Sequence, residues 1–93
     1  MEDATGAHVI VHGTVQGVFF RLETQREARR HGVRGWVRNR PDGTVEALFE
    51  GGAATVDRLV RWCEQGPPAA VVQRVAITPR PYSGRFNDFE VLV

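Results

Sequence analysis

Residues 13–21, GTVQGVFFR, join an alternating segment that is typical of a strand to a polar segment that is typical of a helix. Two glycines and a run of main-chain amides therefore lie at a strand-to-helix turn, where backbone N–H groups and the positive end of a helix can bind an anion. Arg21 falls in or next to the first helical turn, where a cation opposes the helix dipole by roughly 0.3–1 kcal/mol. An anion held between these amides and Arg21 would remove the conflict. Position alone leaves a second interpretation open, which is a surface arginine beside a tight turn.

The chain has 93 residues, the size of one domain with a modest core. Cys63 is the only cysteine, so no internal disulfide is possible and we expect a cytoplasmic protein. The first residues lack the basic start and apolar run of a signal peptide. No stretch approaches about 18 continuous apolar residues, so we expect no contact with a membrane.

The charge balance argues against a nucleic-acid partner. The 12 basic and 11 acidic residues leave a net charge of +1, whereas nucleic-acid-binding domains usually carry a strong basic excess. All 12 basic residues are arginines. Each arginine therefore has to be judged by its position and not by its type.

Hydrophobic patterns divide the chain into strands and helices. They predict strands at residues 8–12, 33–39, 44–50, 71–78 and 86–93, and helices at residues 20–31 and 54–65. The second and third strands form a hairpin around residues 40–43, because Pro followed by Asp-Gly is turn chemistry. Residues 1–7 are expected to be a flexible tail, and residues 8–93 a single domain.

Each predicted helix carries an inward stripe. The first places Phe20, Thr24 and Ala28 on one face, and the second places Val56, Leu59, Val60 and Cys63 on one face. Phe20 is therefore expected in the core. Cys63 is expected to be buried and structural, not a nucleophile.

The order of elements is β-α-β-β-α-β followed by a terminal strand. It predicts an α+β protein with the ferredoxin-like split βαββαβ plan: an antiparallel-dominated sheet, two helices on one face, and an extra C-terminal strand. A right-handed crossover makes the first two strands parallel, so their carboxyl ends meet at one edge of the sheet. The third strand lies between them, and their separation is roughly 9–10 Å.

Asn39 ends the second strand at this edge, where a small ligand can contact both Asn39 and Arg21. Asn is also common at the start of turns, where its side chain holds the local backbone. The residues by themselves leave both interpretations of Asn39 open.

Four motifs resemble the acylphosphatase family: GTVQGVFFR at 13–21, GWVRN at 35–39, DGTVE at 42–46 and WCEQGP at 62–67. The resemblance covers nearly the whole chain. It implies hydrolysis of the carboxyl-phosphate anhydride of acyl phosphates to a carboxylate and inorganic phosphate, with no cofactor and no metal. The expected partners are a small-molecule acyl phosphate, and phosphate or other oxyanions at the loop; we expect a monomer.

The resemblance also implies the site residues. Arg21 would bind the substrate phosphate together with amides of the preceding loop, and Asn39 would position the attacking water for in-line attack. The loop residues are Val15, Gln16, Gly17, Val18, Phe19 and Phe20. The residue types suit these roles, because Arg21 offers a planar fork for two phosphate oxygens and Asn39 can accept a hydrogen bond from water. The leaving group is already a stable carboxylate, so no general acid is required.

Two alternatives stand beside the enzyme. An RNA-recognition domain shares the same plan but stacks bases on sheet aromatics; here the first strand has none and the third has only Phe49, on its apolar face. A non-catalytic relative, serving as the anion-binding part of a carbamoyl-transfer machine, would keep the anion site without turnover. The end of the chain at Val93 and the presence of Arg21 and Asn39 favour the enzyme.

Overall fold

The structure is a computed structural model and describes residues 3–93. Its elements are β1 (Ala4–Thr14), α1 (Phe20–Arg30), β2 (Arg34–Asn39), β3 (Val45–Gly52), α2 (Ala53–Gln65), β4 (Val71–Arg80) and β5 (Phe89–Val91). Neither helix among these residues has the length and apolar run that crossing a membrane requires.

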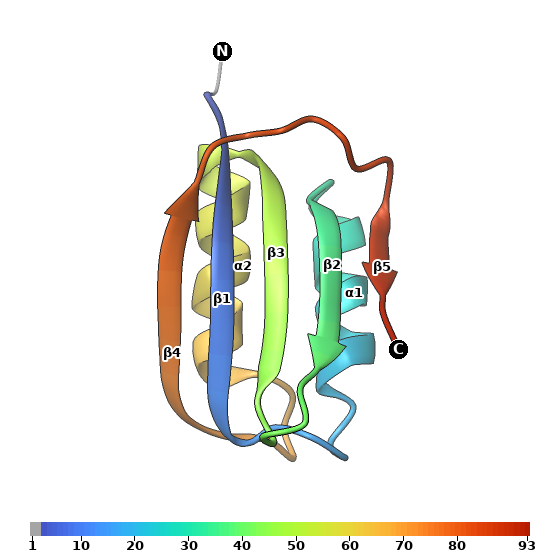
Figure 1. The fold of residues 1–93 in the computed structure, drawn as a ribbon, viewed down its shortest axis with the longest axis vertical. Helices are drawn as coiled ribbons and strands as arrows, with labels where there is room; N and C mark the ends of the chain where they lie inside the picture. Colours follow the sequence, from blue (N-terminus) through green and yellow to red (C-terminus); the bar gives the residue numbers. More distant parts are fainter. Residues whose placement is uncertain (1–2) are drawn as a thin grey trace.

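The strands form one sheet in the order β4-β1-β3-β2-β5. β1 pairs antiparallel with β3 and β4, β2 pairs antiparallel with β3, and only β5 runs parallel to its neighbour β2. Figure 1 shows α1 and α2 side by side behind this sheet, with its other face uncovered. The predicted ferredoxin-like plan with an extra C-terminal strand is therefore confirmed.

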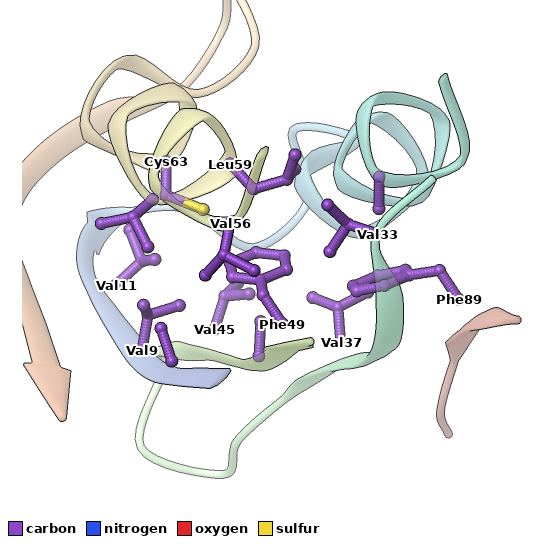
Figure 2. Packing of buried hydrophobic residues seen from close by; sticks show 14 of the residues in the cluster. Val9, Val11, Val33, Val37, Val45, Phe49, Val56, Leu59, Cys63 and Phe89 are labelled. Atoms are coloured by element: carbon purple, nitrogen blue, oxygen red, sulfur yellow. The ribbon is translucent and has the colours of Figure 1, made fainter. Parts of the chain in front are cut away.

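The core lies between the helices and the covered face of the sheet (Figure 2). Both predicted inward stripes are buried, including Phe20, Thr24 and Ala28 of α1 and Val56, Leu59, Val60 and Cys63 of α2. Phe49 is fully buried and stacks on Phe89, with ring centroids 5.6 Å apart. The single aromatic residue of β3 therefore belongs to the core and is not available for stacking on an RNA base.

The first helix is followed by a glycine that caps it. Gly32 has a φ of 69°, and the N–H of Val33 donates to the carbonyl of Ala28 at 2.8 Å. This is the Schellman arrangement, in which a left-handed residue satisfies the last carbonyls of a helix. The chain is thereby turned back to start β2 beside α1.

The predicted flexible tail at residues 1–7 is wrong for residues 4–7, which form the start of β1. Ala4 pairs with Gly52 of β3, and Gly6 pairs with both Glu50 of β3 and Arg80 of β4. β3 and β4 both extend beyond their predicted ends, so they offer backbone partners that a local pattern does not reveal. Residues 1 and 2 lie outside the described part of the chain.

The last strand is shorter than predicted and covers only Phe89–Val91. Residues 81–88 instead form an irregular link across one end of the sheet, from the β4 edge to the β2 edge (Figure 1). Because β5 runs parallel to β2, with Val37 opposite Val91, the end of β5 points toward the same sheet edge as Asn39.

Candidate active site

A glycine directs the chain from β1 into the loop. At Gly13 the register between β1 and β4 shifts, and the residue has a φ of 133°. A Cβ there would lie 2.1 Å from the carbonyl oxygen of Val71. Only glycine permits this close approach of two backbones, which bends the end of β1 toward the first helix.

The loop that follows presents unpaired main-chain donors. Gly17 and Phe19 both adopt left-handed backbone angles, with φ of 75° and 65°. Within residues 3–93, the amides of residues 16–22 donate to no other group, and no side chain caps α1. Glu23 is the first residue of α1 whose N–H has a partner, the carbonyl of Phe19 at 3.0 Å. A turn that mixes right- and left-handed residues before a bare helix N-terminus is an anion-binding arrangement.

Arg21 lies half-buried at this helix end. It lines a pocket of about 510 Å³ together with Asn39, so both predicted side chains reach one cavity. Among the described residues no carboxylate lies close enough to Arg21 for an ion pair. Arg29 on the same helix, in contrast, pairs with Asp88 at 2.8 Å. The surface interpretation of Arg21 is therefore disfavoured, because Arg21 lines the cavity and has no ion-pair partner among the described residues.

The side-chain oxygen Oδ1 of Asn39 is buried and has no hydrogen-bond partner in the described structure. The turn after it is held by other groups. Asp42 Oδ1 accepts from the N–H of Thr44 at 3.0 Å and from its hydroxyl at 2.6 Å. These bonds lower the pKa of Asp42 below its usual range. An Asn that held the turn would accept a backbone N–H through Oδ1, so the structural interpretation of Asn39 loses its main support.

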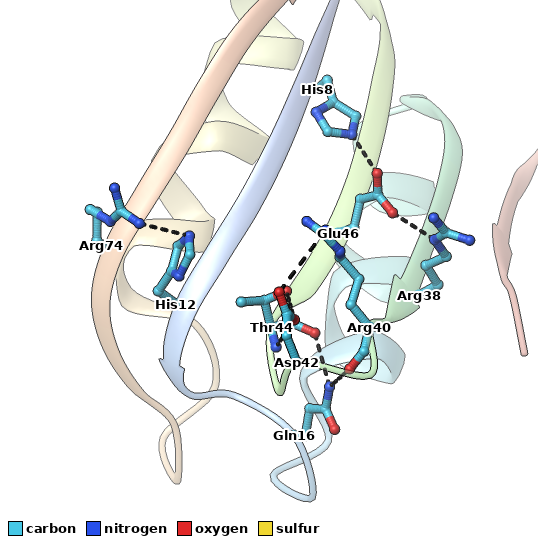
Figure 3. A network of polar contacts seen from close by, with 9 residues as sticks. All are labelled: His8, His12, Gln16, Arg38, Arg40, Asp42, Thr44, Glu46 and Arg74. Carbon is cyan, nitrogen blue, oxygen red and sulfur yellow. Dashed lines mark hydrogen bonds and ion pairs between the residues drawn. The ribbon is translucent and has the colours of Figure 1, made fainter.

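Gln16 ties the loop to this turn (Figure 3). Its side-chain amide Nε2 donates to the carbonyl of Arg40 at 2.7 Å and to the carbonyl of Thr44 at 2.9 Å. The two bonds hold the amide-bearing loop against the segment that follows Asn39. The relative position of Arg21 and Asn39 is thus fixed by a contact between distant parts of the chain.

A second polar cluster lies on the uncovered face of the sheet (Figure 3). Glu46 accepts from Arg38 Nε at 2.6 Å, and its other oxygen lies 2.7 Å from His8 Nε2. Burial opposes ionisation of Glu46, but the hydrogen bonds from His8 and Arg38 outweigh it, and the pKa of Glu46 is lowered. The charge of Arg38, one residue before Asn39, is therefore already paired on the face away from the pocket.

A family model for acylphosphatase matches residues 7–91. The chain belongs to the acylphosphatase family. An acylphosphatase from Pelotomaculum thermopropionicum is 55% identical over 85 residues, covering 91% of this chain and 92% of that protein. One from Gloeobacter violaceus is 55% identical over 92 residues, covering 99% and 98%. The solved structure of an acylphosphatase from Coxiella burnetii matches with a TM-score of 0.91 at 36% identity, over 97% of this chain and 94% of that one.

Most of the site residues that the acylphosphatase resemblance implies line the cavity, namely Val15, Gly17, Phe19, Phe20, Arg21 and Asn39. Gln16 does not line it, because its side chain reaches the hairpin turn, and Val18 packs against the core. Sequence reasoning missed the other lining residues, Leu22, Gln25 and Val91. Leu22 carried a signal, since it is an apolar residue outside the inward stripe of α1; Val91 carried none, because its place depends on how β5 pairs.

Within residues 3–93, no three His, Cys, Asp or Glu side chains come together as a metal site would require. Cys63 is fully buried, and burial raises the pKa of its thiol. The prediction that Cys63 is structural is confirmed.

Proposed function

We propose that this chain hydrolyses acyl phosphates, with Arg21 and the loop amides binding the phosphate and Asn39 positioning the water. One observation carries the proposal: the bare N-terminus of α1, Arg21, which has no ion-pair partner among the described residues, and Asn39, whose Oδ1 accepts no hydrogen bond there, belong to residues that line one pocket. A terminal phosphate supplies acceptors for the first two, and a water molecule supplies a donor for the third. Membership of the acylphosphatase family supports the same reaction.

Phosphate binding uses the two kinds of donor at the start of α1. The guanidinium of Arg21 matches two phosphate oxygens with parallel, charge-assisted hydrogen bonds. The amides of residues 15–20 take the remaining oxygens. The added negative charge also compensates the helix dipole, which Arg21 alone opposes.

Attack on phosphorus requires little chemistry from the protein. The P–O bond to the acyl carboxylate breaks with its electron pair going to that carboxylate, and water forms the new P–O bond on the opposite side. The transition state is loose, so catalysis consists mainly of positioning and charge stabilisation. Asn39 accepts one hydrogen bond from the water but is too weak a base to take its proton, and the phosphate itself accepts the proton.

The carboxylate leaves as a stable anion, so this mechanism uses neither a general acid nor a metal. We therefore propose that turnover is independent of metal ions. A chelator added to the assay checks this directly: release of phosphate should continue at the same rate.

Release of inorganic phosphate from acetyl phosphate by the purified chain tests the proposed function. We expect turnover, with competitive inhibition by inorganic phosphate because product and substrate share the phosphate end. Binding of phosphate without turnover would overturn the enzyme and favour a non-catalytic anion-binding domain. Binding of phosphate is measured separately by calorimetry, so these outcomes are distinguishable.

A further inference from the structure

Exposed apolar side chains gather at the phosphate cradle. Phe19 is 73% exposed, Leu22 is 45% exposed and Val91 is 36% exposed. All three line the same pocket as Arg21 and Asn39. We call Phe19, Leu22 and Val91 the apolar wall. Apolar groups left in water around a polar cavity mark a surface that another apolar group covers.

Phe19 shows that this exposure is maintained against the local backbone preference. Its φ of 65° and ψ of 21° are left-handed, a conformation that glycine and asparagine adopt far more easily than a bulky residue. Packing of the Phe19 ring against the core offsets little of this strain, since 73% of the residue is exposed. A strained, solvent-facing aromatic at the rim of a site is expected where the ring contacts a ligand.

Val91 is held beside the site by two contacts of the C-terminal strand. Gln25 Nε2 of α1 donates to the carbonyl of Phe89 at 3.0 Å, and the N–H of Leu92 donates to the carbonyl of Val37 at 2.8 Å. These two bonds tie β5 to α1 before Val91 and to β2 after it. The wall is therefore built from two separate parts of the chain and is anchored at each.

The lining provides only one charged group, Arg21, which the phosphate engages. Gln25 is already committed to Phe89 through its Nε2. An acyl group with its own negative charge would find no cation there, whereas a hydrocarbon chain or ring would cover the wall. The pocket of about 510 Å³ also has room beside the phosphate for an acyl group larger than acetyl.

We propose that the apolar wall binds the acyl group, and that the substrates of this chain are acyl phosphates with bulky apolar acyl groups, aliphatic or aromatic. The inference rests on the proposed function, because it concerns the leaving group of that reaction. Burial of each methylene is worth about fourfold in affinity. A long acyl chain is therefore selected over acetyl wherever the wall remains intact.

Paired kinetics on acetyl phosphate and hexanoyl phosphate test the proposal. The two leaving carboxylates are nearly equal in basicity, so the kcat/KM ratio of hexanoyl to acetyl phosphate isolates contacts to the chain. We expect a ratio of at least about 10 for the wild type. Leu22→Ser and Val91→Ser should each lower the ratio about three- to fivefold, and the double variant about tenfold or more. Ile77→Ser is the matched control, because Ile77 is 49% exposed but does not line the pocket; its ratio should equal that of the wild type.

Phe19→Gly separates ligand binding from folding. Glycine relieves the left-handed strain, so the melting temperature should stay the same or rise. The hexanoyl-to-acetyl ratio should nevertheless fall about three- to fivefold. A purely structural role for Phe19 predicts the opposite pattern, which is a lower melting temperature with an unchanged ratio.

A wild-type ratio near 1, or wall variants that slow both substrates equally, would overturn the apolar wall while leaving the proposed function intact. Absence of turnover on both substrates would overturn the proposed function, and the wall proposal with it. The acetyl phosphate rate of the wild type alone distinguishes the two failures.

Discussion

Glu50 and the side-chain oxygen of the half-buried Asn39 are buried polar groups near opposite ends of the same sheet, and their hydrogen bonding differs. Glu50 is 3% exposed and accepts from the Ser83 hydroxyl at 2.8 Å, the Ser83 N–H at 3.1 Å and the Gly84 N–H at 3.1 Å. The Oδ1 of Asn39 is equally hidden and accepts nothing within the described structure. One end of the sheet holds a buried carboxylate with its hydrogen bonds made, and the other holds a buried amide oxygen without one.

The difference teaches how stability and function are divided in this domain. A satisfied buried group stabilises the fold, and Glu50 holds the link of residues 81–88 over the sheet end. An unsatisfied one costs about 1–3 kcal/mol, so it persists where a ligand supplies its partner. The following predictions test this division, beginning with the largest expected effect.

Arg21→Gln should lower kcat/KM for acyl phosphates about 10²–10³-fold, because it removes the charged donor of the phosphate cradle. Affinity for inorganic phosphate should fall as well. Arg30→Gln, in the last turn of the same helix, is the matched control and should retain wild-type kinetics. Equal losses in the two variants would show that the effect arises from α1 and not from the cradle.

Asn39→Ala should lower kcat about 10- to 100-fold with a much smaller change in phosphate affinity, because only the water loses its partner. The melting temperature should not fall, since an unsatisfied acceptor is removed. A clear drop in thermal stability, followed by circular dichroism, would instead assign Asn39 to the turn.

Glu50→Gln should have the opposite effects to Asn39→Ala: it should lower stability and leave the kinetics almost unchanged. The amide keeps one acceptor oxygen but turns its NH₂ group toward the donors of Ser83 and Gly84, at a cost of about 1–3 kcal/mol in the free energy of unfolding. Urea denaturation measures the loss. Acyl phosphate kinetics at 25 °C should stay within about twofold of the wild type, and a larger change would mean that the two ends of the sheet are coupled.

Asp42, in the turn after Asn39, should make a small contribution to stability that depends on pH. Its pKa in the fold lies below the ordinary value of 3.8, chiefly because of the hydrogen bonds from Thr44. Its contribution to stability is therefore complete above that value and is lost as pH falls through the folded pKa. Asp42→Asn keeps an acceptor but removes the charge, so its melting temperature should be lower than that of the wild type at pH 7 and converge with it once the pH falls below the folded pKa of Asp42. A constant difference across this range would exclude the charge as the cause.

The sequence pattern predicted those elements that depend on interactions between residues close together in the chain. Alternation and 3.6-residue spacing located the hairpin and the stripe of α2, and the order of elements was sufficient to bring Arg21 and Asn39 to one sheet edge. The prediction failed at residues 4–7 (Ala-Thr-Gly-Ala), because these small side chains carry no strand signal. They are held by backbone bonds to β3 and β4, and such partners exist only in the folded sheet.

The candidate site was predicted as two side chains, Arg21 and Asn39, and a loop. Its remaining residues take their places through contacts between segments that are far apart in the sequence. Gln16 appears in the sequence as one more loop residue, yet it bonds two carbonyls beyond Asn39. Val91 reaches the pocket only because β5 pairs parallel with β2. Neither relation has a period or a motif that would reveal it in one sequence.

The bonds from Gln16 to Arg40 and Thr44 also link the site to the order of assembly. They span 24 and 28 residues, so they form only after β2 and β3 have docked as a hairpin. Before that moment the loop has its glycines and amides but no fixed orientation toward Asn39. The proposed phosphate site is therefore a property of the closed sheet, and a nascent chain that stops short of Thr44 contains the loop without the two bonds that hold it against the hairpin turn.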